Sequence, residues 1–181
     1  MSGNSRMKAG QMGSSKGFTL IEFTIVLLLV GLLTAIAMPS FRQWRSSLNA
    51  NQTARGIVNI IMEARSKAIA ANYQHEIQLD IPNSQYRMSK GSQAYNTPGA
   101  GWAVVSGYDW SLLPSGVTMT SGSNCDLTAT VYVQFNANGT VRLESPPGTV
   151  IPGPVTVCVQ GGAGSKMNKI MVSPSGRITL N

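Results

Sequence analysis

A long apolar run near the N-terminus constrains this chain more than any other feature. The run extends from Phe18 to Met38 and contains one charged side chain, that of Glu22. About 20 apolar residues are what a helix needs to cross a bilayer. A charge inside such a segment is costly and usually marks a function. We therefore expect a membrane-spanning helix whose carboxylate is kept for a purpose.

The segment before this run is polar, carries Arg6, Lys8 and Lys16, and has no acid. One interpretation is a plain membrane anchor. A second is a secretory signal peptide, since Ala35-Ile36-Ala37 imitates a small-residue cleavage site. That interpretation fits poorly, because the run is longer than the usual apolar region of about 7–15 residues and contains an acid. A third is a leader removed directly before the helix.

The third interpretation is supported by a resemblance. The run begins with Gly17-Phe18-Thr19-Leu20-Ile21-Glu22, which resembles the class III leader and N-terminal helix of type IV pilins and type II secretion pseudopilins. The resemblance implies that residues 1–17 are a leader, cut between Gly17 and Phe18 by a prepilin peptidase. It also implies N-methylation of Phe18, an assembly role for Glu22 through an N-terminal amine, and a helix-bending proline at Pro39.

Beyond Pro39 the pattern changes from wholly apolar to amphipathic, with apolar residues three and four positions apart. This pattern predicts a continuous helix from Phe18 to about Ala71, in which 18–38 is the transmembrane and assembly half. The amphipathic half, 39–72, is expected to pack on a sheet, and the proline should kink the helix. The stripe expected to be buried consists of Phe41, Trp44, Leu48, Ile57, Ile61, Ala64 and Ala68.

Residues 73–181 show the alternation typical of strands. Hairpin turns are expected at Asn136-Ala137-Asn138-Gly139 and at Ser173-Pro174-Ser175-Gly176. The fold class is therefore α+β, a long N-terminal helix packed on an antiparallel β-sheet domain, which the resemblance makes pilin-like. The predicted strands are 75–81, 85–89, 101–106, 117–120, 129–135, 140–143, 155–160, 169–173 and 177–180.

The chain has two cysteines, Cys125 and Cys158, both beyond the apolar run. An even number of cysteines outside a membrane favours a disulfide in an oxidising compartment. The alternative is two unpaired thiols, one of them buried in a strand.

Further segments narrow the resemblance to the GspH/FimT branch, which comprises FimT- and FimU-like minor pilins and the H-type minor pseudopilin of type II secretion. They are Ala64–Ala68, Gly101-Trp102, Gln134–Thr140 and Ser173–Arg177. The branch implies a structural subunit at or near a filament tip that helps to initiate assembly. Its implied partners are other major and minor pilins or pseudopilins, the prepilin peptidase, an inner-membrane assembly platform, and membrane lipid before assembly. Its implied location is the inner membrane with a periplasmic domain, then the pilus or pseudopilus at the cell surface.

DNA is a further implied partner, because some FimT-like pilins bind it through a C-terminal Gly-Arg-x-Arg motif. In this chain Gly176-Arg177-Ile178-Thr179 keeps only the first arginine. Lys166 and Lys169 would join Arg177 in contacting phosphates. The other interpretation is a hairpin with scattered exposed cations. The net charge of +7 is a weak argument for nucleic acid, because three of these charges lie in the leader.

The sequence gives no support for an enzyme, a cofactor or a metal centre. The chain has one histidine, His75, for which we expect an ordinary surface role, and its acids show no motif spacing. A calcium site at Asp109 and Asp126 is the remaining metal alternative. Three aromatic residues are expected to cluster in the core, with an exposed interface as the alternative: Trp102, Tyr108 and Trp110.

Overall fold

The computed structural model describes residues 17–95, 101–162 and 165–181. It divides into two compact units, Met1–Pro39 and Ser40–Asn181, which we describe separately. The leader cations Arg6, Lys8 and Lys16 lie outside the described residues.

Helix α1 spans Leu20–Ala71 and has 52 residues. This agrees with the predicted helix to within two residues at its start. Asn72 follows the helix with a φ of 56°, the left-handed conformation that commonly ends helices, and asparagine tolerates it better than most residues. The helix is continuous through Pro39, and the kink predicted there remains a prediction.

In the first unit the large apolar side chains are exposed, from Phe18 just before α1 through Met38 within it. By length and composition, α1 is the one helix among the described residues that is able to cross a membrane. No described residue of this unit buries the apolar surface. An exposed apolar surface of this kind is suited to contact with lipid or with other helices.

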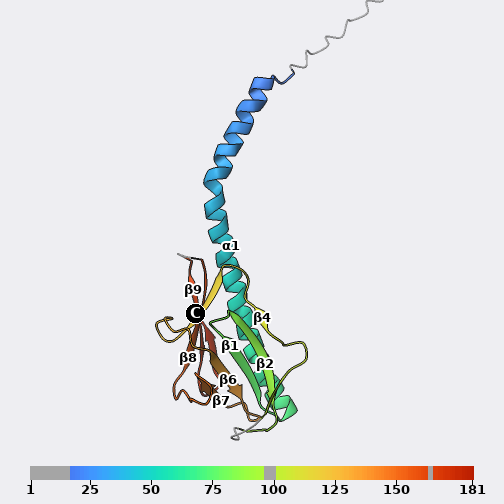
Figure 1. Cartoon of the computed structure of the whole chain (residues 1–181), viewed down its shortest axis with the longest axis vertical. Helices are drawn as coiled ribbons and strands as arrows, with labels where there is room; N and C mark the ends of the chain where they lie inside the picture. The colour runs from blue at the N-terminus through green and yellow to red at the C-terminus, as the bar shows by residue number, and fades with distance from the viewer. Residues whose placement is uncertain (1–16, 96–100, 163–164) are drawn as a thin grey trace, which may run out of the picture. The chain divides into compact units, whose positions relative to one another are not determined.

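The second unit contains two antiparallel sheets beside the later part of α1 (Figure 1). Sheet A has the order β3-β2-β1-β6-β7, with β4 also paired to β2, and sheet B has the order β10-β9-β8-β5. The strands of sheet A are β1 (His75–Asp80), β2 (Gln85–Gly91), β3 (Trp102–Val104), β4 (Ser111–Leu112), β6 (Val131–Phe135) and β7 (Val141–Glu144). Those of sheet B are β5 (Val117–Ser121), β8 (Val155–Gly161), β9 (Met167–Val172) and β10 (Ile178–Leu180).

All nine predicted strands are present, with ends within two residues of the prediction, and only the short β4 was missed. Both predicted turns connect paired neighbours, β6 with β7 and β9 with β10. Gly139 and Gly176 take φ values near 80° in these turns, a conformation that glycine adopts without strain.

One apolar core joins α1 to the inner faces of both sheets. From α1 it takes Ala50, Ala54, Ile57, Ile61, Ala64 and Ala68, all fully buried. From the sheets it takes large side chains such as Ile77, Phe135 and Ile170.

The predicted buried stripe was wrong at its start. Phe41, Trp44 and Leu48 are exposed, and burial begins at Ala50. The physical reason is that sheet B first contacts α1 near Ser46, and helical spacing does not reveal how far along the helix a sheet extends. A Cβ placed on Gly161 would lie 2.3 Å from the carbonyl oxygen of Ser46, so this contact leaves no room for large side chains. Small residues therefore line this part of the interface.

Candidate functional site

The start of α1 is fixed by Thr19. Its hydroxyl accepts a hydrogen bond from the backbone amide of Glu22 at 3.3 Å, and its carbonyl accepts the first helical bond, from Phe23, at 3.2 Å. Glu22 is therefore the third helical residue, where the acid of a capping box stands. Its negative charge also lies in the first turn, where the helix dipole favours it.

Gly17 and Phe18 precede the helix, and both are exposed. The predicted cleavage residues thus lie just before α1, and the predicted assembly acid lies in its first turn. The cleavage, the N-methylation of Phe18 and the assembly role of Glu22 remain predictions.

The structure joins Cys125 to Cys158 in a disulfide, and the two residues are separated by 33 in sequence. Cys158 lies in β8 between the inward-facing Val157 and Val159, so it belongs to the outer face of sheet B. Cys125 lies in the loop after β5, and the bond ties this loop to the sheet. Neither cysteine is free.

The three cations predicted to contact DNA are all exposed. The backbone of Lys169 exchanges hydrogen bonds with Asn181, and Arg177 lies opposite Ser173 in the β9–β10 pair. Lys169 and Arg177 are therefore on the outer face of sheet B, about 13 Å apart at roughly 3.3 Å per residue. Lys166 precedes β9. None of the three forms an ion pair with a described residue.

Three of the four segments that carry the GspH/FimT resemblance meet at one end of the sheets. Arg65 of α1 donates from Nη1 to the carbonyl of Gly176 at 3.1 Å. A Cβ on Gly139 would lie 3.5 Å from Nε of the same arginine. The amide of Val141 donates to the carbonyl of Pro174 at 3.3 Å. These motif residues thus hold the two hairpin turns against α1. This packing accounts for the glycine at position 176, and no ligand is needed to explain it.

The surface role expected for His75 is wrong. The residue is 3% exposed, and its Nδ1 lies 3.1 Å from the carbonyl oxygen of Tyr73. Burial lowers the pKa of His75, the hydrogen bond to Tyr73 opposes this, and Lys90 and Lys67 lower it further. The side chain is therefore held neutral as part of the packing beside α1.

The expected aromatic cluster is also wrong. Trp102 is 37% exposed, whereas the ring of Trp110 lies 4.3 Å from the guanidinium carbon of Arg87. The hydroxyl of Tyr108 donates to Glu63 of α1. The rings are thus divided among three different environments. Across the described residues there is no group of three or more His, Cys, Asp or Glu side chains that could hold a metal ion.

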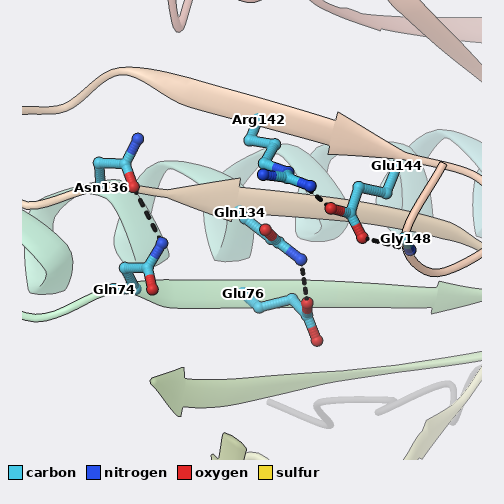
Figure 2. Close-up of polar contacts among 7 residues, drawn as sticks. All are labelled: Gln74, Glu76, Gln134, Asn136, Arg142, Glu144 and Gly148. Atoms are coloured by element: carbon cyan, nitrogen blue, oxygen red, sulfur yellow. Dashed lines mark hydrogen bonds and ion pairs between the residues drawn. The ribbon is translucent and has the colours of Figure 1, made fainter. Parts of the chain in front are cut away.

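A polar network on the outer face of sheet A escaped the sequence analysis (Figure 2). Glu76 is 6% exposed, and its Oε2 accepts a hydrogen bond from Nε2 of Gln134 at 2.9 Å. Glu144 is equally buried and accepts from Nε of Arg142 at 2.6 Å and from the amide of Gly148 at 2.8 Å. Gly148 belongs to the loop between β7 and β8, which therefore packs against this face.

The carboxyl of Glu76 has an unusual environment. Burial raises its pKa to about 7, the hydrogen bond from Gln134 opposes the rise, Glu144 adds to it and Arg87 reduces it. Glu76 belongs to no ion pair among the described residues. The sequence signal was the alternation of Glu76, Gln78 and Asp80 with apolar neighbours, which is typical of any solvent-facing strand.

No family model matches this chain. Fimbrial protein Q of Moraxella bovis is 35% identical over 63 residues, which make up 35% of this chain and 38% of that protein. The chain thus matches less than half the length of this curated relative.

Two solved structures were compared. The minor pseudopilin EpsH from the type 2 secretion system of Vibrio cholerae aligns with a TM-score of 0.51 and 12% identity, covering 74% of this chain and 96% of EpsH. The type IV minor pilin FimU of Pseudomonas aeruginosa aligns with a TM-score of 0.44 and 20% identity, covering 72% and 87%. The FimU likeness is too weak to add to the argument. Because the alignment covers nearly all of EpsH, this chain has a pilin-like fold.

Proposed function

We propose that this chain is a minor pilin, a structural subunit that enters a type IV pilus at or near its tip and helps to initiate assembly. One observation carries the proposal: a pilin-like fold whose helix begins with an exposed apolar segment and an acid in its first turn. An apolar surface of this length needs lipid before assembly and neighbouring helices after it. The role is structural rather than catalytic.

The proposal assigns a task to each part of the chain. Residues 1–17 are the leader removed by a prepilin peptidase, and Phe18 is the methylated N-terminus. Residues 18–38 hold the subunit in the inner membrane and then pack within the filament. Residues 39–72 and the β-rich domain 73–181 stay in the periplasm and contact other pilins, while the assembly platform acts from the inner membrane.

Glu22 is proposed to guide docking. A carboxylate in hydrocarbon costs at least a few kcal/mol, and a nearby ammonium reduces that cost. The amine of Phe18, in the same or a neighbouring subunit, is the partner nearest in sequence. A subunit docked out of register would leave the acid unpaired, so pairing favours the correct position.

The test compares Glu22→Val with the control Thr24→Val, which alters an exposed polar residue of the same helix. The hydroxyl of Thr24 bonds only the carbonyl of Ile21 within its own turn. We expect normal amounts of both variants in membranes, and strong loss of the Glu22 variant alone from sheared filaments. Mass spectrometry should give a mature chain that begins at methylated Phe18. Wild-type levels of the Glu22 variant in filaments, or any other N-terminus, would contradict the proposal.

The second candidate is an H-type minor pseudopilin of type II secretion, which the likeness to EpsH favours. A structural likeness at 12% identity is evidence about the fold alone. A genetic test is therefore needed to distinguish a type IV minor pilin from a type II pseudopilin. Deletion should abolish surface pili in the first case. In the second it should leave pili intact and trap secreted proteins in the periplasm.

A DNA-binding role for natural transformation is supported only by the exposed cations on and beside the outer face of sheet B. We expect such binding to weaken with salt and with Arg177→Ala, because phosphate contacts release counterions. The control is Arg55→Ala, at an exposed arginine of α1. If a gel-shift assay at low salt detects no binding of DNA, this role is excluded.

A further inference from the structure

The outer face of sheet A contains a cavity that the proposed function does not use. Its volume is about 470 Å³, within the usual range for small-molecule sites. Strands β1, β2, β3, β6 and β7 form its base and sides, and the loop at Pro147 and Gly148 lines one side. All of these elements belong to the unit Ser40–Asn181.

The cavity wall holds a buried hydroxyl without a partner. Ser89 is 3% exposed, and its hydroxyl makes no hydrogen bond to any described residue. Described side-chain polar atoms that are wholly buried all have a partner, so this oxygen must open into the cavity that Ser89 lines. A hydroxyl that opens into a cavity is available to both donate and accept a hydrogen bond there.

Glu76 lies directly opposite Ser89 in the β1–β2 ladder. Its Oε2 is bonded to Gln134, whereas its second carboxylate oxygen has no described hydrogen-bond partner. By the same reasoning, that oxygen also opens into the cavity. The two neighbouring residues together provide an acceptor and a hydroxyl with unused capacity.

The same wall also carries a positively charged hydrogen-bond donor, Arg87. Arg87 donates from Nε to Gln78 at 2.9 Å and lies over the ring of Trp110. The terminal nitrogens of its guanidinium form no ion pair with a described residue. Arg87 and Glu76 therefore line one cavity without forming a direct ion pair.

This combination selects against simple ions. A cation would meet Arg87, and an anion would meet Glu76 and Glu144. A ligand that donates and accepts at adjacent positions satisfies both groups, and vicinal hydroxyls on a sugar ring do this. Trp102 lines the same cavity and offers an aromatic surface for the C–H face of such a ring.

We propose that this cavity binds a saccharide, whose hydroxyls bond Ser89, Glu76 and Arg87 while its ring contacts Trp102. The raised pKa of Glu76 is compatible with this, because a carboxyl that is partly protonated near neutrality both accepts and donates. The proposal does not rest on filament assembly. Its failure would leave the proposed function intact, and the reverse also holds.

The test uses the full chain in detergent and a defined set of probes. These are glucose, galactose, mannose, N-acetylglucosamine, cellobiose and chitobiose, measured by saturation-transfer NMR and tryptophan fluorescence. n-Butylammonium and acetate serve as charged probes. We expect at least one saccharide to bind and neither ion to do so. Failure of all six saccharides, or binding of an ion at this cavity in their place, would overturn the proposal.

Variants locate the binding. Ser89→Ala should weaken it about tenfold, the equivalent of one hydrogen bond, and Trp102→Ala should weaken it at least as much. Glu76→Gln keeps the shape of the side chain and serves as a third variant if either of these fails to fold. Thr156→Ala, on the outer face of sheet B, is the matched control and should bind as wild type. Unchanged binding by Ser89→Ala and Trp102→Ala, or equal loss in the control, would place the saccharide elsewhere and contradict the assignment.

Discussion

The two sheets face α1 in the same way and differ on their outer sides. Both bury aliphatic side chains against the helix, such as Leu79 in sheet A and Val159 in sheet B. The outer face of sheet A is organised by buried acids and amides under the β7–β8 loop. That of sheet B is held by a disulfide and carries exposed cations. The inner faces are constrained by one shared core, whereas the side chains of each outer face are not and can have separate functions.

Removal of the disulfide, which lies on the outer face of sheet B, should produce the largest effect. A closed loop with a separation of 33 residues is worth about 4 kcal/mol in the chain-entropy model. We expect reduction, or the double change Cys125→Ser and Cys158→Ser, to lower the melting temperature by about 10 °C. Calorimetry with and without reductant measures this. An unchanged melt with both thiols alkylated would mean that the bridge contributes nothing.

The next largest effect is expected in sheet A, and its dependence on pH distinguishes it from the effect of the disulfide in sheet B. The pKa of Glu76 is raised from 4.5 to about 7, so the folded state holds this proton more tightly than the unfolded state. Its contribution to stability is complete below pH 4.5 and is lost as the pH rises through 7. Glu76→Gln imitates the neutral carboxyl and should therefore gain up to about 3 kcal/mol over wild type above pH 7.

Urea unfolding at several pH values measures this difference. The control is Asp126→Asn, which changes an exposed acid in the loop beside sheet B. The control should run parallel to wild type. A constant gap between Glu76→Gln and wild type across the whole pH range would show that the carboxyl is not perturbed by folding.

A smaller effect is expected where the two sheets meet. Arg65 bonds the turn of sheet B at Gly176 and lies beside the turn of sheet A at Gly139. Arg65→Ala should lower the free energy of unfolding by about 1.5 kcal/mol, the value of one hydrogen bond to a charged group. The control Arg55→Ala changes an exposed arginine of the same helix. Equal unfolding energies for the two variants would mean that the link is dispensable.

The smallest effect is predicted for the cations of sheet B. Lys169→Ala and Arg177→Ala remove exposed side chains that form no ion pair with a described residue. Changes of this kind usually stay within about 0.5 kcal/mol. A larger decrease in the free energy of unfolding, measured by thermal unfolding, would show that this outer face, like that of sheet A, contains a structural network.

The elements that the sequence predicted well are those with strong local signals. The helix ends at Ala71 because Asn72 takes the left-handed conformation, and both hairpins form at turns that contain glycine. The two-residue β4 has too little pattern to be recognised. Phe41 was misjudged because helical spacing gives the face of a residue but not how far along the helix the sheets extend.

The site was predictable only in part. Thr19 and Glu22 are close in sequence, so the start of the helix was within reach of a local pattern. The cavity of sheet A depends on strand register, which places Glu76 beside Ser89 and Gln134. It also depends on a loop that turns an ordinary polar face into a buried one. Neither the register nor the loop contact is encoded at short range, so no local sequence pattern marked these residues as a site.

The cap on α1 has a consequence for maturation. Thr19 supplies the first acceptors of the helix, and Gly17 and Phe18 stand before it. Severing the chain between these two residues would break no hydrogen bond of the helix. The rod that emerges would carry its own cap from the moment of its release, with only Phe18 left as a flexible joint for its new terminus.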